Sequence, residues 1–193
     1  MKKHGKTFYF LRHAETTWNQ KKLCQGTIDI DLSENGVKEA TLLAQKLASF
    51  PLECICTSPL TRALRTAQMI HKHHPTVPFK ILEELKERNW GHMQGSSSSQ
   101  MYEFEMHEEL NPDFVPPLGI ETRTEMKERL KKGLEKAFQI HREPLLVSHG
   151  RLFIALCELL EVPLIRQVPN LCLIKFCHDG SSWSCQLLSE DLY

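Results

Sequence analysis

The chain has 193 residues, of which 41% are hydrophobic and 25% charged, and its formal net charge is zero. This length and composition are typical of an ordinary globular protein, so we expect a single domain over residues 1–193. A neutral chain favours neither nucleic acid nor a membrane as partner, and any anion must be bound locally. The apolar run after Lys3 is too short for a signal peptide, and no segment reaches the length of a membrane span. The chain has seven cysteines without a disulfide-rich pattern, which is typical of free thiols in a reducing compartment. We therefore expect a cytoplasmic protein.

The first half of the chain alternates between buried strands and helices. Residues 8–11 are aromatic and branched, which is typical of a strand covered on both faces. A helix is expected over residues 33–49, and a second buried strand over residues 52–57. Ser58 then caps another helix, with Pro59 at its first position, where the missing N–H costs nothing.

The second half continues this alternation. The pattern predicts a strand over residues 79–82, a long helix that begins at Glu121, a strand over residues 145–147, a helix opened by Gly150, and a hairpin of residues 170–177 and 183–188. Such an order predicts a three-layer α/β/α sandwich with a mostly parallel sheet and a C-terminal antiparallel hairpin.

Residues 96–118 form the least regular segment. Four serines precede Met, Glu and aromatic residues, and Asn111-Pro112 and Pro116-Pro117 follow. We expect an inserted lid or loop over the site, with one short helix around residues 101–109. The serine run is equally compatible with a loosely ordered surface that has no role.

Basic side chains follow three of the buried strands. Arg12 and His13 follow the first strand, Arg62 lies in the first turn after the second, and His149 follows residues 145–147. Open α/β sheets bind ligands at the carboxyl ends of their strands, so we expect these side chains to meet. Arginine can bond two phosphoryl oxygens at once, and the helix N-termini after Ser58 and Gly150 add N–H donors. The pattern predicts a phosphoryl site, although each basic side chain could instead pair with a carboxylate elsewhere.

A neutral histidine can attack phosphorus and carry the phosphoryl group until water removes it. This reaction needs a proton donor, for which Glu87 is a candidate, although acidic residues here are also typical of a solvated surface. It requires no metal. His71, His73 and His74 end a helix, where cations are favoured, and no carboxylate or cysteine nearby completes a ligand set. We therefore expect neither a metal site nor a cofactor.

Five ordered segments resemble the histidine phosphatase superfamily, which has the phosphoglycerate mutase-like fold. They are residues 11–19 (Leu-Arg-His-Ala-Glu-Thr-Thr-Trp-Asn), 58–67, 87–95, 147–150 and Asn170. The resemblance covers nearly the whole chain. It implies that His13 is the phosphorylated nucleophile and that Glu87 donates and accepts the proton. It also implies a set of phosphoryl-binding and pocket-lining residues: Arg12, Arg62, His149, Asn19, Gln25, Gly26 and Trp90.

Details of these motifs point to two branches of the family. Residues 90–95 resemble the mutases, whereas Gln25-Gly26 and Ala14 resemble phosphatases, and Gly-Ile-Glu-Thr at residues 119–122 departs from the usual Gly-Glu-Ser. A mutase must exclude water, and the resembling mutases carry a longer cover and a C-terminal tail that this sequence does not offer.

We therefore expect a metal-independent phosphatase that hydrolyses phosphate monoesters through a phosphohistidine on His13. A phosphoglycerate mutase with the same nucleophile is the alternative. An inactive phospho-ligand-binding protein is a third reading, which would need neither a nucleophile nor an acid. The expected partner is a small phosphorylated substrate, and the oligomeric state stays open, with a homodimer as one option.

Overall fold

A six-stranded sheet in the order β3-β2-β4-β1-β5-β6 forms the centre of the molecule, which is known from a computed structural model that describes residues 5–111, 113–163 and 167–188. The strands are β1 (Thr7–Arg12), β2 (Cys54–Thr57), β3 (Phe79–Ile81), β4 (Pro144–Ser148), β5 (Leu173–His178) and β6 (Trp183–Leu187). Strands β1 to β4 run parallel, and β5 and β6 add the predicted antiparallel hairpin beside β1.

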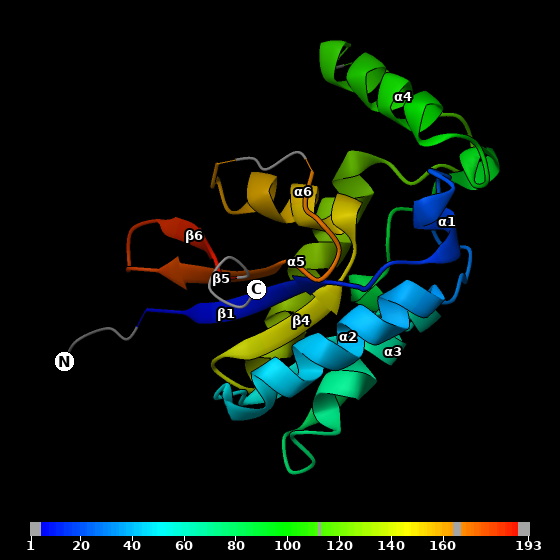
Figure 1. Cartoon of the computed structure of the whole chain (residues 1–193). Helices are drawn as coiled ribbons and strands as arrows, with labels where there is room; N and C mark the ends of the chain where they lie inside the picture. Colours follow the sequence, from blue (N-terminus) through cyan, green and yellow to red (C-terminus); the bar gives the residue numbers. More distant parts are fainter. Residues whose placement is uncertain (1–4, 112, 164–166, 189–193) are drawn as a thin grey trace.

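Helices cover both faces of this sheet (Figure 1). They are α1 (Thr17–Gln20), α2 (Glu34–Lys46), α3 (Thr61–His71), α4 (Ser98–Leu110), α5 (Arg123–Ile140) and α6 (Gly150–Leu159), with 3-10 turns at Leu47–Ser49, Glu83–Leu85 and Gly91–Met93. Strand β1 shows how the layers arise, because Phe8 and Phe10 pack into one core with α5 and α6, while Tyr9 and Leu11 pack into the other with α2 and α3. The predicted three-layer α/β/α sandwich is confirmed.

The start of α3 differs from the prediction. Ser58 and Pro59 precede the helix, which begins at Thr61 with Leu60 as its N-cap. The Ser58 hydroxyl accepts a hydrogen bond from the Leu60 N–H at 3.2 Å and bonds His149 Nε2 at 2.8 Å. The prediction that Ser58 caps α3 was therefore wrong, because this side chain is used to hold a histidine of the site.

The segment of residues 96–118 is more regular than its sequence suggested. It contains the 13-residue helix α4, which Ser97 caps in a reciprocal capping box with Gln100. The serine run is therefore a helix start and not a loosely ordered surface. Pro112, in the same segment, lies outside the described residues.

Helix α4 has no continuous apolar stripe, and ion pairs supply much of its attachment to the rest of the molecule. Figure 1 shows it standing away from the sheet, and Met101 is its buried side chain. Three ion pairs tie α4 to the body of the molecule: Arg88–Glu108, Arg123–Glu109 and Arg151–Glu105. The short helix expected around residues 101–109 is therefore present, and it is longer than predicted because its ends carry no apolar periodicity.

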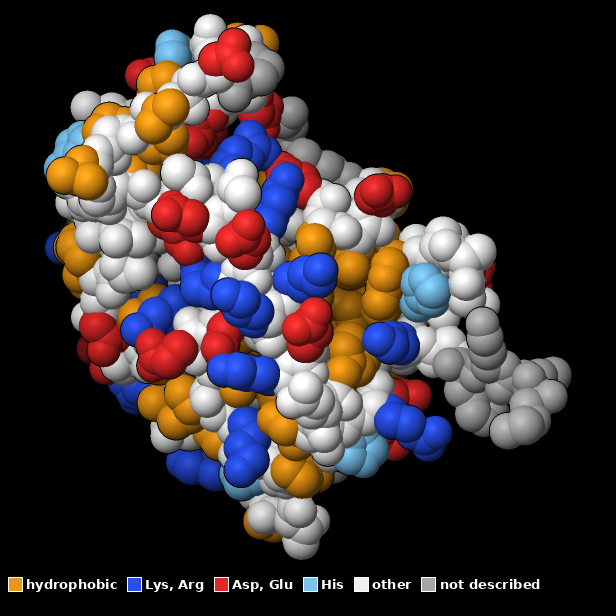
Figure 2. Space-filling view, turned by 180° about the vertical axis from the view of Figure 1, so that it is seen from behind, with side chains coloured by type: hydrophobic (Ala, Val, Ile, Leu, Met, Phe, Trp, Pro, Cys, Tyr) orange, Lys and Arg blue, Asp and Glu red, His pale blue; other side chains and the backbone are white. Residues whose placement is uncertain are grey.

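Charged side chains of both signs are interspersed on the face that lies behind the sheet in Figure 1. Figure 2 shows this face, where Lys and Arg alternate with Asp and Glu, in agreement with the net charge of zero. Within the described residues, no helix combines the length and the apolar composition needed to cross a membrane.

Candidate active site

The carboxyl ends of three neighbouring strands meet at one place, because β4 lies between β1 and β2 in the sheet. Arg12 is level with Ser148, and the His13 N–H donates to the Ser148 carbonyl at 2.9 Å. These strand ends open into a cavity of about 290 Å³, here called the strand-end cavity. Its lining includes Arg12, His13, Asn19, Gln25, Gly26, Arg62, Glu87, Trp90 and Gly150.

His13 is held as a neutral imidazole with one nitrogen available. Its Nδ1 lies 2.7 Å from the Ala14 carbonyl oxygen, and because a carbonyl only accepts, Nδ1 carries the proton. Burial, followed by the nearby Arg62 and Arg12, lowers the pKa of His13 well below 6.5. The imidazole is therefore uncharged at neutral pH, and Nε2 retains a lone pair.

Arg12 and Arg62 make the cavity cationic. Backbone carbonyls hold their guanidinium groups: Val168 bonds Arg12, and Gly26 and Ile28 bond Arg62. Neither forms an ion pair with a carboxylate of the described residues, which makes the alternative of pairing elsewhere wrong for both. Burial lowers the pKa of Arg62 to about 10, so this side chain stays charged at neutral pH.

Each of these arginines also keeps a donor for a ligand. Among the described residues, the buried Nε atoms of Arg12 and Arg62 have no hydrogen-bond partner. A buried donor of this kind costs free energy unless something binds it. An anion with several acceptor oxygens is the group that both atoms fit.

His149 lies behind His13 and not on the cavity wall. Its side chain is fully buried, and the ring centroids of the two histidines are 5.2 Å apart. Burial first, and then Arg62, His13 and Arg12, lower its pKa well below 6.5. Nε2 bonds Ser58, while the buried Nδ1 has no partner within the described part of the chain. The predicted contact of His149 with a phosphoryl oxygen stays a prediction.

Glu87 also lines the cavity and follows the turn at Glu83–Leu85. Its Oε1 accepts from the N–H groups of Arg88 and Leu152 at 2.9 and 3.2 Å, and Oε2 accepts from Arg151 at 3.1 Å. These bonds fix the orientation of the carboxyl group, and Oε2 keeps a lone pair that can bind a proton.

The helix N-termini are used differently from the prediction. Glu87 accepts from the N–H groups of Arg151 and Leu152 in α6, and Asp29 accepts from the Thr61 N–H of α3 at 2.7 Å. For these three N–H groups, the expectation of direct phosphoryl binding was wrong, since carboxylates of the chain already bind them. A contact from Gly150, whose Cα lies beside the Arg12 guanidinium, stays a prediction.

The remaining predicted pocket residues shape the cavity. Gly26 adopts a φ of 56°, and a Cβ there would lie 2.3 Å from Gln94 Oε1, which explains the glycine. Thr16 caps α1 in a capping box with Asn19, and the Gln25 side chain is buried against the cavity. Trp90 forms a small core with Cys24, Met101 and Ile120, so it anchors α4 over the site.

The structure also brings residues to the site that the sequence reasoning missed. Arg151, Tyr102 and Gln167 line the strand-end cavity and a second one beside it. Arg151 follows the motif of residues 147–150 directly, and this adjacency was a usable signal. Tyr102 and Gln167 carried none. Within the described residues, no group of three His, Cys, Asp or Glu side chains is placed to hold a metal ion.

Residues 8–191 match the family model of the histidine phosphatase superfamily, branch 1. The chain belongs to this superfamily. Among curated relatives, it is 34% identical to the uncharacterised phosphatase PhoE of Bacillus subtilis over 142 residues, which are 72% of this chain and 69% of PhoE. It is 31% identical to a 2,3-bisphosphoglycerate-dependent phosphoglycerate mutase of Chlamydia felis over 121 residues, 62% of this chain and 53% of the mutase. The family expected from the motifs is confirmed.

Solved structures agree with this fold. A mycobacterial glucosyl-3-phosphoglycerate phosphatase superposes with a TM-score of 0.79 at 23% identity, covering 95% of this chain and 97% of the other. A phosphoglycerate mutase from Bacillus anthracis superposes with a TM-score of 0.78 at 23% identity, covering 97% and 94%. The phosphoglycerate mutase-like fold of this superfamily member is therefore confirmed.

Proposed function

We propose that this histidine phosphatase is a metal-independent phosphomonoesterase that works through a phosphohistidine on His13. The observation that carries the proposal is the neutral His13 imidazole, which shares a cavity wall with two charged arginines and has Nδ1 bonded to the Ala14 carbonyl. A nucleophile for phosphorus needs this lone pair on Nε2, and the anionic phosphoryl group needs the two cations.

In the first half of the reaction, His13 Nε2 attacks phosphorus, and the bond from phosphorus to the ester oxygen breaks. The Nε atoms of Arg12 and Arg62 bind phosphoryl oxygens, where they offset the negative charge. Glu87, in its acid form, gives its proton from Oε2 to the leaving oxygen, so that the product departs as a neutral alcohol.

In the second half, water attacks the phosphohistidine, and the bond between phosphorus and Nε2 breaks. Glu87, now ionised, accepts a proton from that water. Inorganic phosphate leaves, His13 returns to its neutral form, and Glu87 is again an acid. The atoms and charges balance without a metal or any other co-reactant.

Phosphoglycerate mutase is the second candidate, since mutases are among the curated relatives. Both reactions share the phosphohistidine and differ in what receives the phosphoryl group. A phosphorus NMR time course with 3-phosphoglycerate, primed with 2,3-bisphosphoglycerate, tests between them. We expect inorganic phosphate to grow without sustained formation of 2-phosphoglycerate. Growth of 2-phosphoglycerate at enzyme-like rates with a flat phosphate signal would establish the mutase instead.

A further inference from the structure

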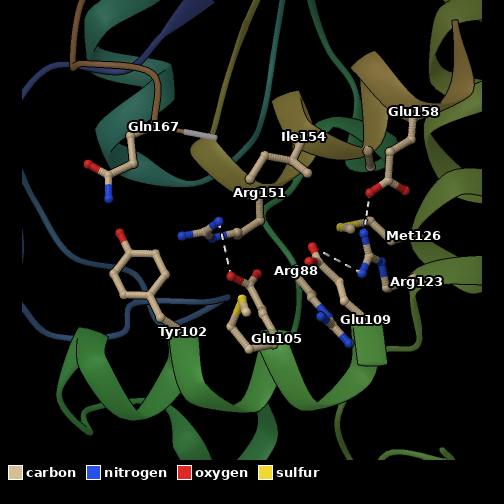
Figure 3. A pocket seen from close by; sticks show the side chains of 12 residues that line it. Arg88, Tyr102, Glu105, Glu109, Arg123, Met126, Arg151, Ile154, Glu158 and Gln167 are labelled. Carbon is tan, nitrogen blue, oxygen red and sulfur yellow. Dashed lines mark hydrogen bonds and ion pairs between the residues drawn. The ribbon is translucent and has the colours of Figure 1, made fainter. Parts of the chain in front are cut away.

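A second cavity of about 190 Å³ lies beside the strand-end cavity, between α4 and α6, and is here called the α4–α6 cavity. Figure 3 shows α4 along one side of it, with Tyr102 and Glu105 rising from that helix toward Arg151 and Ile154 of α6. The two cavities share Tyr102, Arg151 and Gln167. The two cavities therefore adjoin at these three side chains.

Arg151, one of the three shared residues, is in direct contact with Glu87, the predicted proton donor. The backbone N–H of Arg151 bonds Glu87 Oε2, the oxygen from which the leaving group would receive its proton. A leaving alcohol that touches Glu87 consequently has its carbon atoms next to Arg151. The rest of the alcohol can then continue past Arg151 into the α4–α6 cavity.

The surface of this cavity is mainly apolar. Met106, Met126, Ile154 and Ala155 contribute to it, together with the ring of Tyr102, over which the Arg151 guanidinium lies at 4.8 Å. Binding of apolar carbon atoms to such a surface is favourable, because it removes apolar area from water.

Among the described residues, each cation that lines this cavity has a carboxylate partner. Arg151 Nη1 lies 3.1 Å from Glu105, with side-chain exposures of 13% and 17%. Arg88 pairs with Glu108, and Arg123 pairs with Glu158 and, at 3.7 Å, with Glu109. A second negative charge on the substrate would find no unpaired cation among these described residues and would lose its hydration.

We propose that the α4–α6 cavity binds the leaving group of the phosphate ester, that this group is an uncharged, partly aromatic or aliphatic alcohol, and that the Arg151–Glu105 pair rejects alcohols carrying a second negative charge. Glu105 cancels the charge of Arg151, which would otherwise attract a carboxylate or a second phosphate at the junction of the cavities. Glu105 is thus a specificity-determining residue that acts through Arg151. The proposal rests on the phosphomonoesterase function proposed above.

The test compares two esters of nearly identical shape, 4-carbamoylbenzyl phosphate and 4-carboxybenzyl phosphate, which differ by one negative charge. Their methylene group insulates the leaving oxygen from the ring substituent. The ratio of their kcat/KM values reports only steps up to cleavage of the ester bond, so dephosphorylation of His13 does not affect it. We expect the wild-type protein to prefer the carbamoyl ester by about tenfold or more, the effect of an uncompensated charge worth at least 1.4 kcal/mol.

Glu105→Gln should lower this preference about tenfold, because it leaves Arg151 with an unpaired charge. Glu103→Gln, an equal charge change at an exposed position of the same helix, should leave the ratio unchanged. Met106→Arg adds a cation at a side chain that is 49% exposed and should lower the ratio independently, whereas Met106→Gln should not. Thermal unfolding confirms that each variant is folded.

A wild-type preference for the carboxylated ester, or an unchanged ratio in both Glu105→Gln and Met106→Arg, would overturn the inference and leave the phosphatase function intact. Hydrolysis of sugar phosphates but of neither benzyl ester would do the same. If no phosphate ester is hydrolysed at all, the proposed function itself fails, and the inference fails with it.

Discussion

The Oε2 atom of Glu87 accepts a hydrogen bond from the backbone N–H of Arg151 at 3.1 Å, which joins the predicted proton donor to the first turn of α6. The same α6 begins directly after His149, at the end of β4. The acid is thus held relative to β4 and β1 by backbone groups. Its position does not depend on the packing of a mobile side chain, and this arrangement makes its role testable by a substitution of nearly equal shape.

Glu87→Gln should slow the phosphorylation step with poor leaving groups by about 10²–10⁴-fold, the usual contribution of a positioned general acid. p-Nitrophenyl phosphate should lose much less, because its leaving group needs little protonation. Rapid-quench kinetics measure this step for both substrates. Glu84→Gln is the matched control, since Glu84 pairs with Lys136 away from the cavity. Equal losses on both substrates would assign Glu87 a structural role.

His13→Ala should abolish turnover and covalent labelling together. A labelled phosphate ester, quenched within milliseconds, should give the wild-type protein an acid-labile, base-stable phosphoryl group. His71→Ala removes a histidine at the end of α3 and should keep both label and turnover. Persistent labelling in the His13 variant would assign the nucleophile to another side chain.

Chelation should leave the activity unchanged, because Arg12 and Arg62 supply the positive charge that Mg²⁺ provides at other phosphoryl-transfer sites. We expect equal rates of phosphate release with and without excess EDTA, and inhibition by vanadate, which resembles five-coordinate phosphorus. The detection of phosphate must itself be independent of metal. An activity that falls with EDTA and returns with Mg²⁺ or Zn²⁺ would contradict the metal-independent mechanism.

The Arg88–Glu108 pair should be the most costly ion pair to break. Its two hydrogen bonds measure 2.7 and 2.6 Å, and its side chains are only 2% and 6% exposed. Glu108→Ala would leave a buried guanidinium unpaired, at a cost of about 3–5 kcal/mol of unfolding free energy. Arg65→Ala breaks the exposed Arg65–Asp31 pair and should cost less than about 1 kcal/mol. Urea unfolding measures the free energy of unfolding of both variants. Equal losses would show that the buried pair contributes no more to stability than the exposed pair.

The preference between the two benzyl esters should depend on pH. Burial, together with Glu87, raises the pKa of Glu105 to about 7, against the opposing charges of Arg151, Arg88 and Arg123. Above pH 7, Glu105 is ionised and cancels the charge of Arg151. Below pH 7 it becomes neutral, so the preference for the carbamoyl ester should fall from pH 8 to pH 6.

Protonation changes at the reaction centre act on both benzyl esters alike and cancel in the ratio, while the substrate carboxylate stays ionised throughout. Glu105→Gln is the control and should give a ratio that does not change with pH. A wild-type ratio that is constant from pH 6 to pH 8 would contradict the assignment to Glu105.

The sequence by itself determined the fold class, the family and most of the residues that meet at the site. Residues 8–11 and 145–147 are continuously apolar and residues 52–57 are largely so, which identifies central strands, and the basic residues that follow them must then reach one edge of a parallel sheet. The local sequence pattern was sufficient for these inferences. Each needs only the apolar pattern of one element and the identity of the residues at its carboxyl end.

Only the tertiary structure decided which partner each polar group takes. Ser58 looked like a helix cap by its position, yet it holds His149 across 91 positions of the chain, and the N–H groups of α6 bind Glu87 instead of remaining available for a ligand. The sequence predicted a short helix in place of α4, but its full length and its ion pairs were visible only in the structure. Hydrogen bonds and ion pairs between distant segments are selected by three-dimensional proximity, and no local property of the sequence carries that information.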